Sequence, residues 1–109
     1  MNKSNAIKKT RFIKSLYKAI EDLDPIEDWV DERDLNNIWA QSLKSQGFNA
    51  LTIRSVEDLK NIPYPYAIVS NEMCEADIIE NDVELRDSYI YDEIDTYYDH
   101  LVIKANYEV

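Results

Sequence analysis

The sequence contains very few of the residue types that nucleotide, metal and redox sites require. Gly47 is the only glycine among 109 residues, whereas a phosphate-binding loop needs several glycines so that backbone amides can approach the phosphate. Walker A and dinucleotide-binding motifs are therefore excluded. Zinc sites need several cysteine or histidine ligands at short spacing, and Cys74 and His100 are the only residues of those types. We expect no cofactor and no metal.

Motifs for catalysis or for a dedicated calcium site are missing as well. His100 could serve a Ser-His-Asp set only if a motif positioned it, and none does, so we expect it to be a surface or interface residue. The best candidate for a calcium loop starts at Asp82, but it lacks the glycine of an EF-hand and places Arg86 where a ligand should be. We therefore expect a protein that is not an enzyme.

Long apolar runs and linker-like segments are also absent. The longest apolar runs, residues 66–69 and 101–103, are far shorter than the roughly 20 residues of a membrane span, and the N-terminal lysines precede no apolar signal segment. A lone cysteine fits a reducing cytoplasm. With three prolines, one glycine and no internal repeat, the chain is expected to form a single compact domain over residues 1–109 and to have no membrane partner.

Charge is abundant and is distributed unevenly. The first 20 residues hold six basic side chains and no acid, whereas the remaining 89 hold six basic side chains and all 22 acids, a net charge of −16. We therefore divide the domain into a basic N-terminal helix at about residues 5–23 and an acidic body at residues 24–109. Such a body disfavours direct binding to nucleic acid, because phosphate recognition depends on lysine and arginine. It favours a basic partner and speeds the encounter with one by electrostatic steering.

Two stretches of the N-terminal half show the apolar spacing of amphipathic helices. Residues 5–23 predict a helix that ends before Asp24-Pro25. A second helix is expected to start at Asp31 or Asp34 and to end at Gly47. The acids between the two helices form either a solvated connection or a second acidic patch. The side chains expected to face inward are Phe12, Ile13, Leu16, Tyr17, Ile20 and Leu23 in the first helix and Leu35, Ile38, Trp39 and Leu43 in the second.

The C-terminal half shows mainly strand patterns. Strands are predicted at residues 51–54, 66–70, about 73–85 with a turn at Asn81-Asp82, and 101–107, where Leu101, Ile103, Ala105 and Tyr107 share one face. Ser55-x-x-Asp58 predicts a short capped helix between the first two strands. Residues 87–101 fit a helix capped by Asp87 or Ser88, and they also fit a strand hairpin. The expected fold class is α+β, with N-terminal amphipathic helices packed on a small antiparallel sheet formed mainly by the C-terminal half.

The densest acidic stretch lies in this half, at residues 72–99. It holds eleven carboxylates, which Arg86 alone offsets, and four tyrosines are placed between them. Carboxylates at i and i+4 on a helix lie roughly 5–6 Å apart and those at i and i+2 on a strand about 6.6 Å apart, so rows of them can imitate DNA phosphates. Mutual repulsion lowers stability, which indicates a role beyond folding. An acidic surface that only maintains solubility is the alternative.

These features resemble a known class of small proteins. Tyrosines interleaved with acids, as in Tyr89-Ile90-Tyr91-Asp92-Glu93 and Tyr97-Tyr98-Asp99, on a short acidic chain without a catalytic motif, are similar to the DNA-mimic inhibitors that phages and mobile elements encode. Anti-restriction and anti-CRISPR proteins are of this type. The resemblance implies a protein that acts in the cytoplasm of a bacterial host and occupies the nucleic-acid site of a defence enzyme. The basic first helix departs from this pattern, and it either contacts an acidic part of the target or packs on the protein's own acidic body.

The function expected from the sequence is therefore non-enzymatic inhibition of a basic, nucleic-acid-binding host defence protein, such as a CRISPR effector or restriction enzyme. We expect a monomer or weak homodimer. The alternatives are an immunity or antitoxin-type protein that neutralises a basic nuclease toxin, and a small structural or assembly protein. The residues predicted to bind the partner are Glu75, Asp77, Glu80, Asp82, Glu84, Asp87, Tyr89, Tyr91, Asp92, Glu93, Asp95, Tyr98 and Asp99.

Overall fold

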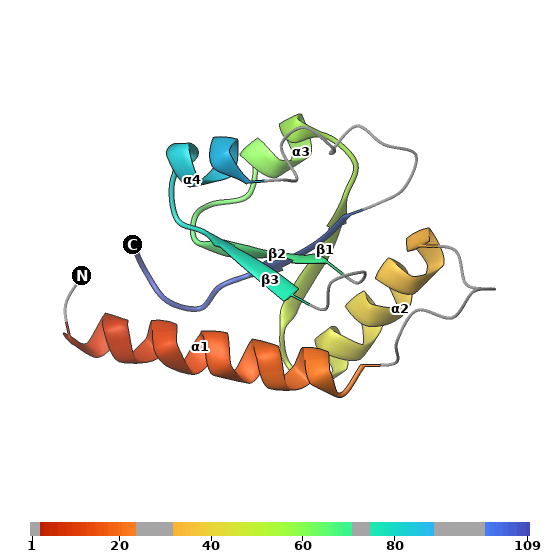
Figure 1. The fold of residues 1–109 in the computed structure, drawn as a ribbon, viewed down its shortest axis with the longest axis horizontal. Helices are drawn as coiled ribbons and strands as arrows, with labels where there is room; N and C mark the ends of the chain where they lie inside the picture. The colour runs from red at the N-terminus through yellow and green to blue at the C-terminus, as the bar shows by residue number, and fades with distance from the viewer. Residues whose placement is uncertain (1–2, 24–31, 71–74, 89–99) are drawn as a thin grey trace.

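The structure is a computed structural model that describes residues 3–23, 32–70, 75–88 and 100–109 (Figure 1). It is an α+β fold in which N-terminal helices pack on a four-stranded antiparallel sheet from the C-terminal half, so the predicted fold class is confirmed. The elements in chain order are α1 (Lys3–Glu21), α2 (Glu32–Ser45), β1 (Asn49–Ile53), α3 (Val56–Lys60), β2 (Tyr66–Ser70), β3 (Glu75–Ile79), α4 (Asp82–Asp87) and β4 (His100–Lys104).

The strands are ordered β1-β4-β2-β3, and every pairing is antiparallel. β4 therefore lies between β1 and β2, although it is the last strand in the chain. Among the described strands, β1 and β3 form the two edges of the sheet. Helices cover both faces: α1 and α2 lie against one face, and α3 and α4 lie against the other (Figure 1).

Strand alternation divides the apolar residues of the sheet between two cores. Leu101 and Ile103 of β4 face α1 and α2, together with Ala105 and Tyr107 beyond the end of the strand. Val102 points to the opposite face, where the second core forms under α3 and α4. The predicted grouping of Leu101, Ile103, Ala105 and Tyr107 on one face is thus confirmed. Because both faces of β4 are covered, Leu101, Val102 and Ile103 are all buried in the middle of the strand.

The N-terminal helices follow the predicted periodicity with one exception. Leu16 and Ile20 of α1 and Trp39 and Leu43 of α2 are buried. Ile38 was expected to face inward, but its side chain is 53% exposed. Asn36 and Ala40 of α2 are also buried, so the middle of the buried face lies on the side of the helix away from Ile38.

Two predicted helix-end signals, Gly47 after α2 and Ser55 before α3, are confirmed. Gly47, two residues after the end of α2, has a φ of 96°, the left-handed conformation that a helix-terminating glycine adopts at little cost. The hydroxyl of Ser55 accepts a hydrogen bond from the backbone N–H of Asp58 at 3.1 Å and caps α3. At the start of α2 the prediction was half wrong, because the helix begins at Glu32 and Asp34 therefore lies inside it rather than at its cap.

The predicted strand over residues 73–85 is correct only in its first part. β3 ends at Ile79, and the chain then enters α4, a short helix capped by Asn81 rather than a second strand. The Asn81 side chain accepts a hydrogen bond from the N–H of Glu84 at 2.9 Å. This contact stabilises helix at the position where a strand pair with a turn at Asn81-Asp82 was expected.

Two further expectations concern the chain after α4. His100 was expected at the surface or in an interface, but within the fold it is a buried residue of β4, opposite Ile53 of β1, because β4 begins one residue earlier than predicted. Asp87 is the last residue of α4 and Ser88 is its C-cap. The choice between helix and strand for residues 87–101 falls largely outside the described residues, as do Cys74 and most of the acidic connection before α2.

No helix among the described residues is long and apolar enough to cross a membrane.

Candidate partner-binding surface

The carboxylates of β3 and of the residue after it lie on different faces of the sheet. Asp77 lies opposite Ile68, which belongs to the core under α3 and α4, and Glu75 is on the same face two residues earlier. Ala76 and Ile78 point the other way and pack on the core beneath α1. Alternation thus places Glu75 and Asp77 on the α4 side of the molecule and directs Glu80, the residue after β3, toward α1.

α4 adds further carboxylates on the same side as Glu75 and Asp77. Leu85 anchors this helix by packing into the core beside Ile79 of β3, which leaves Asp82 and Asp87 exposed on its outer side. Arg86 is the one basic residue of α4. We call Glu75, Asp77, Asp82 and Asp87 the β3–α4 acidic surface.

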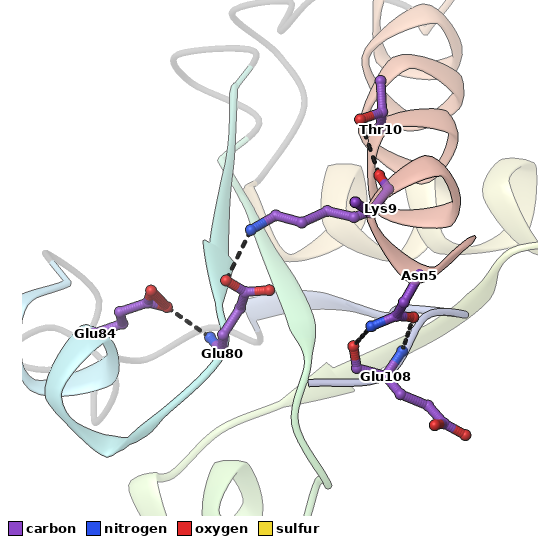
Figure 2. A network of polar contacts seen from close by, with 7 residues as sticks. Asn5, Lys9, Thr10, Glu80, Glu84 and Glu108 are labelled. Atoms are coloured by element: carbon purple, nitrogen blue, oxygen red, sulfur yellow. Dashed lines mark hydrogen bonds and ion pairs between the residues drawn. The ribbon is translucent and has the colours of Figure 1, made fainter. Parts of the chain in front are cut away.

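Glu80 and Glu84 are held by contacts within the chain (Figure 2). Lys9 reaches from α1 to Glu80, with Nζ 2.8 Å from Oε1, and the side chains of Lys9 and Glu80 are only 31% and 17% exposed. The backbone N–H of Glu80 donates to Oε2 of Glu84 at 2.7 Å. Both carboxylates were predicted to bind a partner. Within the described chain, their contacts connect α1, the end of β3 and α4.

Tyr107 lies against the same group. The Lys9 ammonium is 5.9 Å from the centre of the Tyr107 ring, a cation–π distance. Burial raises the pKa of the Tyr107 hydroxyl, and the neighbouring Glu80 and Glu84 carboxylates raise it further, because a phenolate formed there would lose hydration and meet negative charge. Near the start of α1, Asn5 accepts from the N–H of Glu108 at 2.8 Å and donates to its carbonyl (Figure 2).

Tyr64, in the loop before β2, contacts the β3–α4 acidic surface. The hydroxyl of Tyr64 donates a hydrogen bond to Oδ1 of Asp82, and the Tyr64 ring stacks on Tyr66 with ring centres 5.5 Å apart. Burial raises the pKa of Tyr64 to about 12, and the Asp82 carboxylate contributes to the rise. The contact fixes Asp82 at the first turn of α4, where a carboxylate is favourable for the helix dipole.

The basic helix packs on the protein's own acidic body through one cation and exposes the other five. Lys9 packs against the acidic body through Glu80. The other five cations of α1 are exposed, and none of them forms an ion pair with a described residue. Because α1 and α4 cover opposite faces of the sheet (Figure 1), the described molecule has a basic side and an acidic side. The five cations are Lys3, Lys8, Arg11, Lys14 and Lys18.

The predicted site residues therefore fall into three groups. Glu75, Asp77, Asp82 and Asp87 lie together on the acidic surface, whereas Glu80 and Glu84 are used internally. The rest of the predicted site lies outside the described residues. Those residues are Tyr89, Tyr91, Asp92, Glu93, Asp95, Tyr98 and Asp99.

Sequence reasoning missed the part that Lys9, Tyr64 and Tyr107 play around these carboxylates. The pattern Asn81-x-x-Glu84, a capping signal, was the one local feature from which α4 could have been found. Among the described residues, no group of three or more side chains could hold a metal ion. Comparison with protein-family models, with curated proteins and with solved structures finds no match for this chain.

Proposed function

We propose that this protein is a non-enzymatic inhibitor that binds a basic, nucleic-acid-binding protein through its acidic side, in competition with DNA. The observation that carries the proposal is the separation of charge across the sheet. Glu75, Asp77, Asp82 and Asp87 lie on the α4 side, and the five exposed cations of α1 lie on the other. A protein with such an arrangement orients in the field of a basic partner before contact, which raises the association rate.

The spacing of the acidic surface supports imitation of phosphates. Glu75 and Asp77 are two residues apart on one strand face, about 6.6 Å from Cα to Cα, while DNA carries a phosphate for each 3.4 Å of axis per strand and a longer distance along its winding backbone. Asp82 is fixed by Tyr64. Carboxylates held on a strand and a capped helix require little ordering when a partner binds.

Edge protection is a competing explanation for two of these residues. Charged side chains on an edge strand prevent pairing with another sheet, and β3 is an edge among the described strands. This explanation covers Glu75 and Asp77, but it leaves Asp82 and Asp87 on α4 unexplained. A partner that uses all four residues accounts for both groups.

The test is capture of a binding protein from bacterial lysate, followed by competition with duplex DNA. We expect the captured protein to bind nucleic acid, to be released by competing DNA, and to bind less as salt rises from low to high ionic strength. The double variant Glu75→Lys/Asp87→Lys should weaken capture. The control Glu21→Lys/Asp22→Lys, which changes net charge equally at the end of α1, should retain it. A captured nuclease toxin would favour the immunity-protein alternative, and capture that DNA does not affect contradicts the proposal.

A further inference from the structure

A pocket of about 430 Å³ lies between α1, the turn after α2 and the end of β4. Its volume is within the range of roughly 300–1,000 Å³ that small-molecule sites occupy. Phe12 and Phe48 supply an apolar part of its wall, and their rings are in edge contact with centres 6.5 Å apart. Polar side chains, among them Asn49 and Asn106, also line it. The pocket is distinct from the β3–α4 acidic surface.

The charge of this pocket is opposite to that of the chain as a whole. Arg11 and Lys104 line it, and none of the lining residues is acidic, although the chain contains 22 acids and 12 basic residues. Arg11 is exposed and forms no ion pair with a described residue. Its guanidinium carries several N–H donors, whose planar arrangement suits a carboxylate or phosphate.

Lys104 is a half-buried cation with neutral neighbours. Its ammonium donates hydrogen bonds to the carbonyls of Pro65 at 3.0 Å and Ala105 at 3.3 Å, and no described carboxylate pairs with it. Burial lowers the pKa of Lys104, as expected for a cation without an opposing charge. Lys104 lies opposite Tyr66 of β2, which belongs to the core under α3 and α4, so strand alternation directs the Lys104 side chain away from α1. Arg11 is therefore the cation that an anion in the pocket would contact.

We propose that this pocket binds a small organic anion, in which a carboxylate or phosphate group contacts Arg11 and a flat apolar group lies against Phe12 and Phe48. The site does not depend on the acidic surface, because α1 and the turn after α2 lie on the opposite face of the sheet from α4. The protein thus carries a second binding function on its basic side.

Nuclear magnetic resonance titration tests this assignment with benzoate, phenyl phosphate and the cationic analogue benzylamine. Gly47 also lines the pocket and is the only glycine, so its amide resonance is a readily assigned reporter. We expect saturable shifts of Gly47, Asn49 and Asn106 with at least one of the two anions, and the tighter of the two identifies the preferred anionic group. Benzylamine should cause no saturable shift at these positions.

Two matched variants separate the pocket from the general positive charge of α1. Arg11→Gln should weaken anion binding roughly tenfold, the effect of losing one charge-assisted hydrogen bond. Lys18→Gln, which removes an exposed cation of α1 outside the pocket, should leave the affinity within about twofold. Absence of saturable shifts with both anions, equal shifts with benzylamine, or equal weakening by the two variants would overturn the proposal.

Discussion

Lys9 and Glu80 are 71 residues apart in the sequence, and their charged groups meet at 2.8 Å. The ion pair connects the basic helix α1 to the residue that links β3 and α4. It therefore uses one cation of the basic side and one carboxylate of the acidic body to connect the two layers that flank the sheet. Figure 2 shows the Lys9 side chain extended toward Glu80, and Glu80 lies between Lys9 and Glu84.

Removing this contact should lower the stability of the fold. We expect Lys9→Met and Glu80→Gln each to reduce the free energy of unfolding by about 1–2 kcal/mol, less than for a fully buried pair because both side chains retain some exposure to water. Urea unfolding of both variants and of the double variant measures the interaction. The control Lys8→Met, at an exposed neighbouring lysine, should change stability by less than about 0.5 kcal/mol. Equal effects at positions 8 and 9 would contradict the assignment.

The cap of α4 should contribute measurably to stability. Asn81→Ala removes the acceptor for the N–H of Glu84 and should cost about 1 kcal/mol, whereas Asn81→Ser keeps an acceptor and should cost much less. Chemical denaturation compares the two variants. If alanine and serine are equivalent at position 81, the cap does not stabilise the helix.

Gly47 should be intolerant of side chains for conformational reasons alone. Its φ is 96°, and a β-carbon at this position would meet no atom within 4 Å. Gly47→Ala should therefore lower the free energy of unfolding by about 1–2 kcal/mol through backbone strain, while Gly47→Asn should lower it less, because asparagine tolerates the left-handed region better. Thermal unfolding of both variants tests this order, and alanine at least as stable as asparagine would refute it.

Alkaline pH should destabilise the protein through its tyrosines. The folded-state pKa of Tyr64 is about 12, and in the unfolded chain the pKa is about 10. Above pH 10 the unfolded chain therefore loses a proton from Tyr64 that the folded chain keeps. The contribution of Tyr64 to the free energy of unfolding is constant below about pH 10 and should fall between about pH 10 and 12. Burial likewise raises the pKa values of Tyr66 and Tyr107.

Ultraviolet titration of phenolate formation, together with unfolding curves across this pH range, checks the expectation. Tyr64→Phe should reduce the loss of stability between pH 10 and 12, because it removes one of the groups that titrate differently in the two states. The same alkaline loss in Tyr64→Phe and in the unmodified protein would show that Tyr64 titrates at its ordinary pKa.

Much of the fold could be predicted because its periodicities are local. Leu101, Ile103, Ala105 and Tyr107 alternate over seven residues, and the sheet places all four in one core. Gly47 and Ser55 have short-range conformational preferences that act whatever the rest of the chain does. Fold class followed from these signals, because apolar helix faces and strand faces must cover one another.

α4 was missed because competing local patterns overlap in a few residues. Val83 and Leu85 alternate with acids as they would in a strand, and only the Asn81-x-x-Glu84 pattern indicated a helix. A helix of six residues is too short for periodicity to show. Its stability comes from the cap and from packing of Leu85 on the sheet, and the packing depends on tertiary structure.

The candidate site was less predictable than the fold. The predicted partner-binding residues include Glu75, Asp77, Glu80 and Glu84, and in the fold Glu80 pairs with Lys9 while Glu84 accepts a hydrogen bond from the N–H of Glu80. Contacts across 71 residues depend on how helices dock on the sheet, and no local pattern in the sequence encodes that arrangement.

The central claim is that the acidic side of this protein occupies a DNA-binding surface, and the most direct measurement is competition for the captured partner. With the partner held at constant concentration, duplex DNA should displace the protein in a saturable manner. Glu75→Lys/Asp87→Lys should weaken partner binding by at least tenfold, the equivalent of about 1.4 kcal/mol, and Glu21→Lys/Asp22→Lys should not. Binding of protein and DNA to the partner at the same time, with both double variants equally affected, would contradict the account.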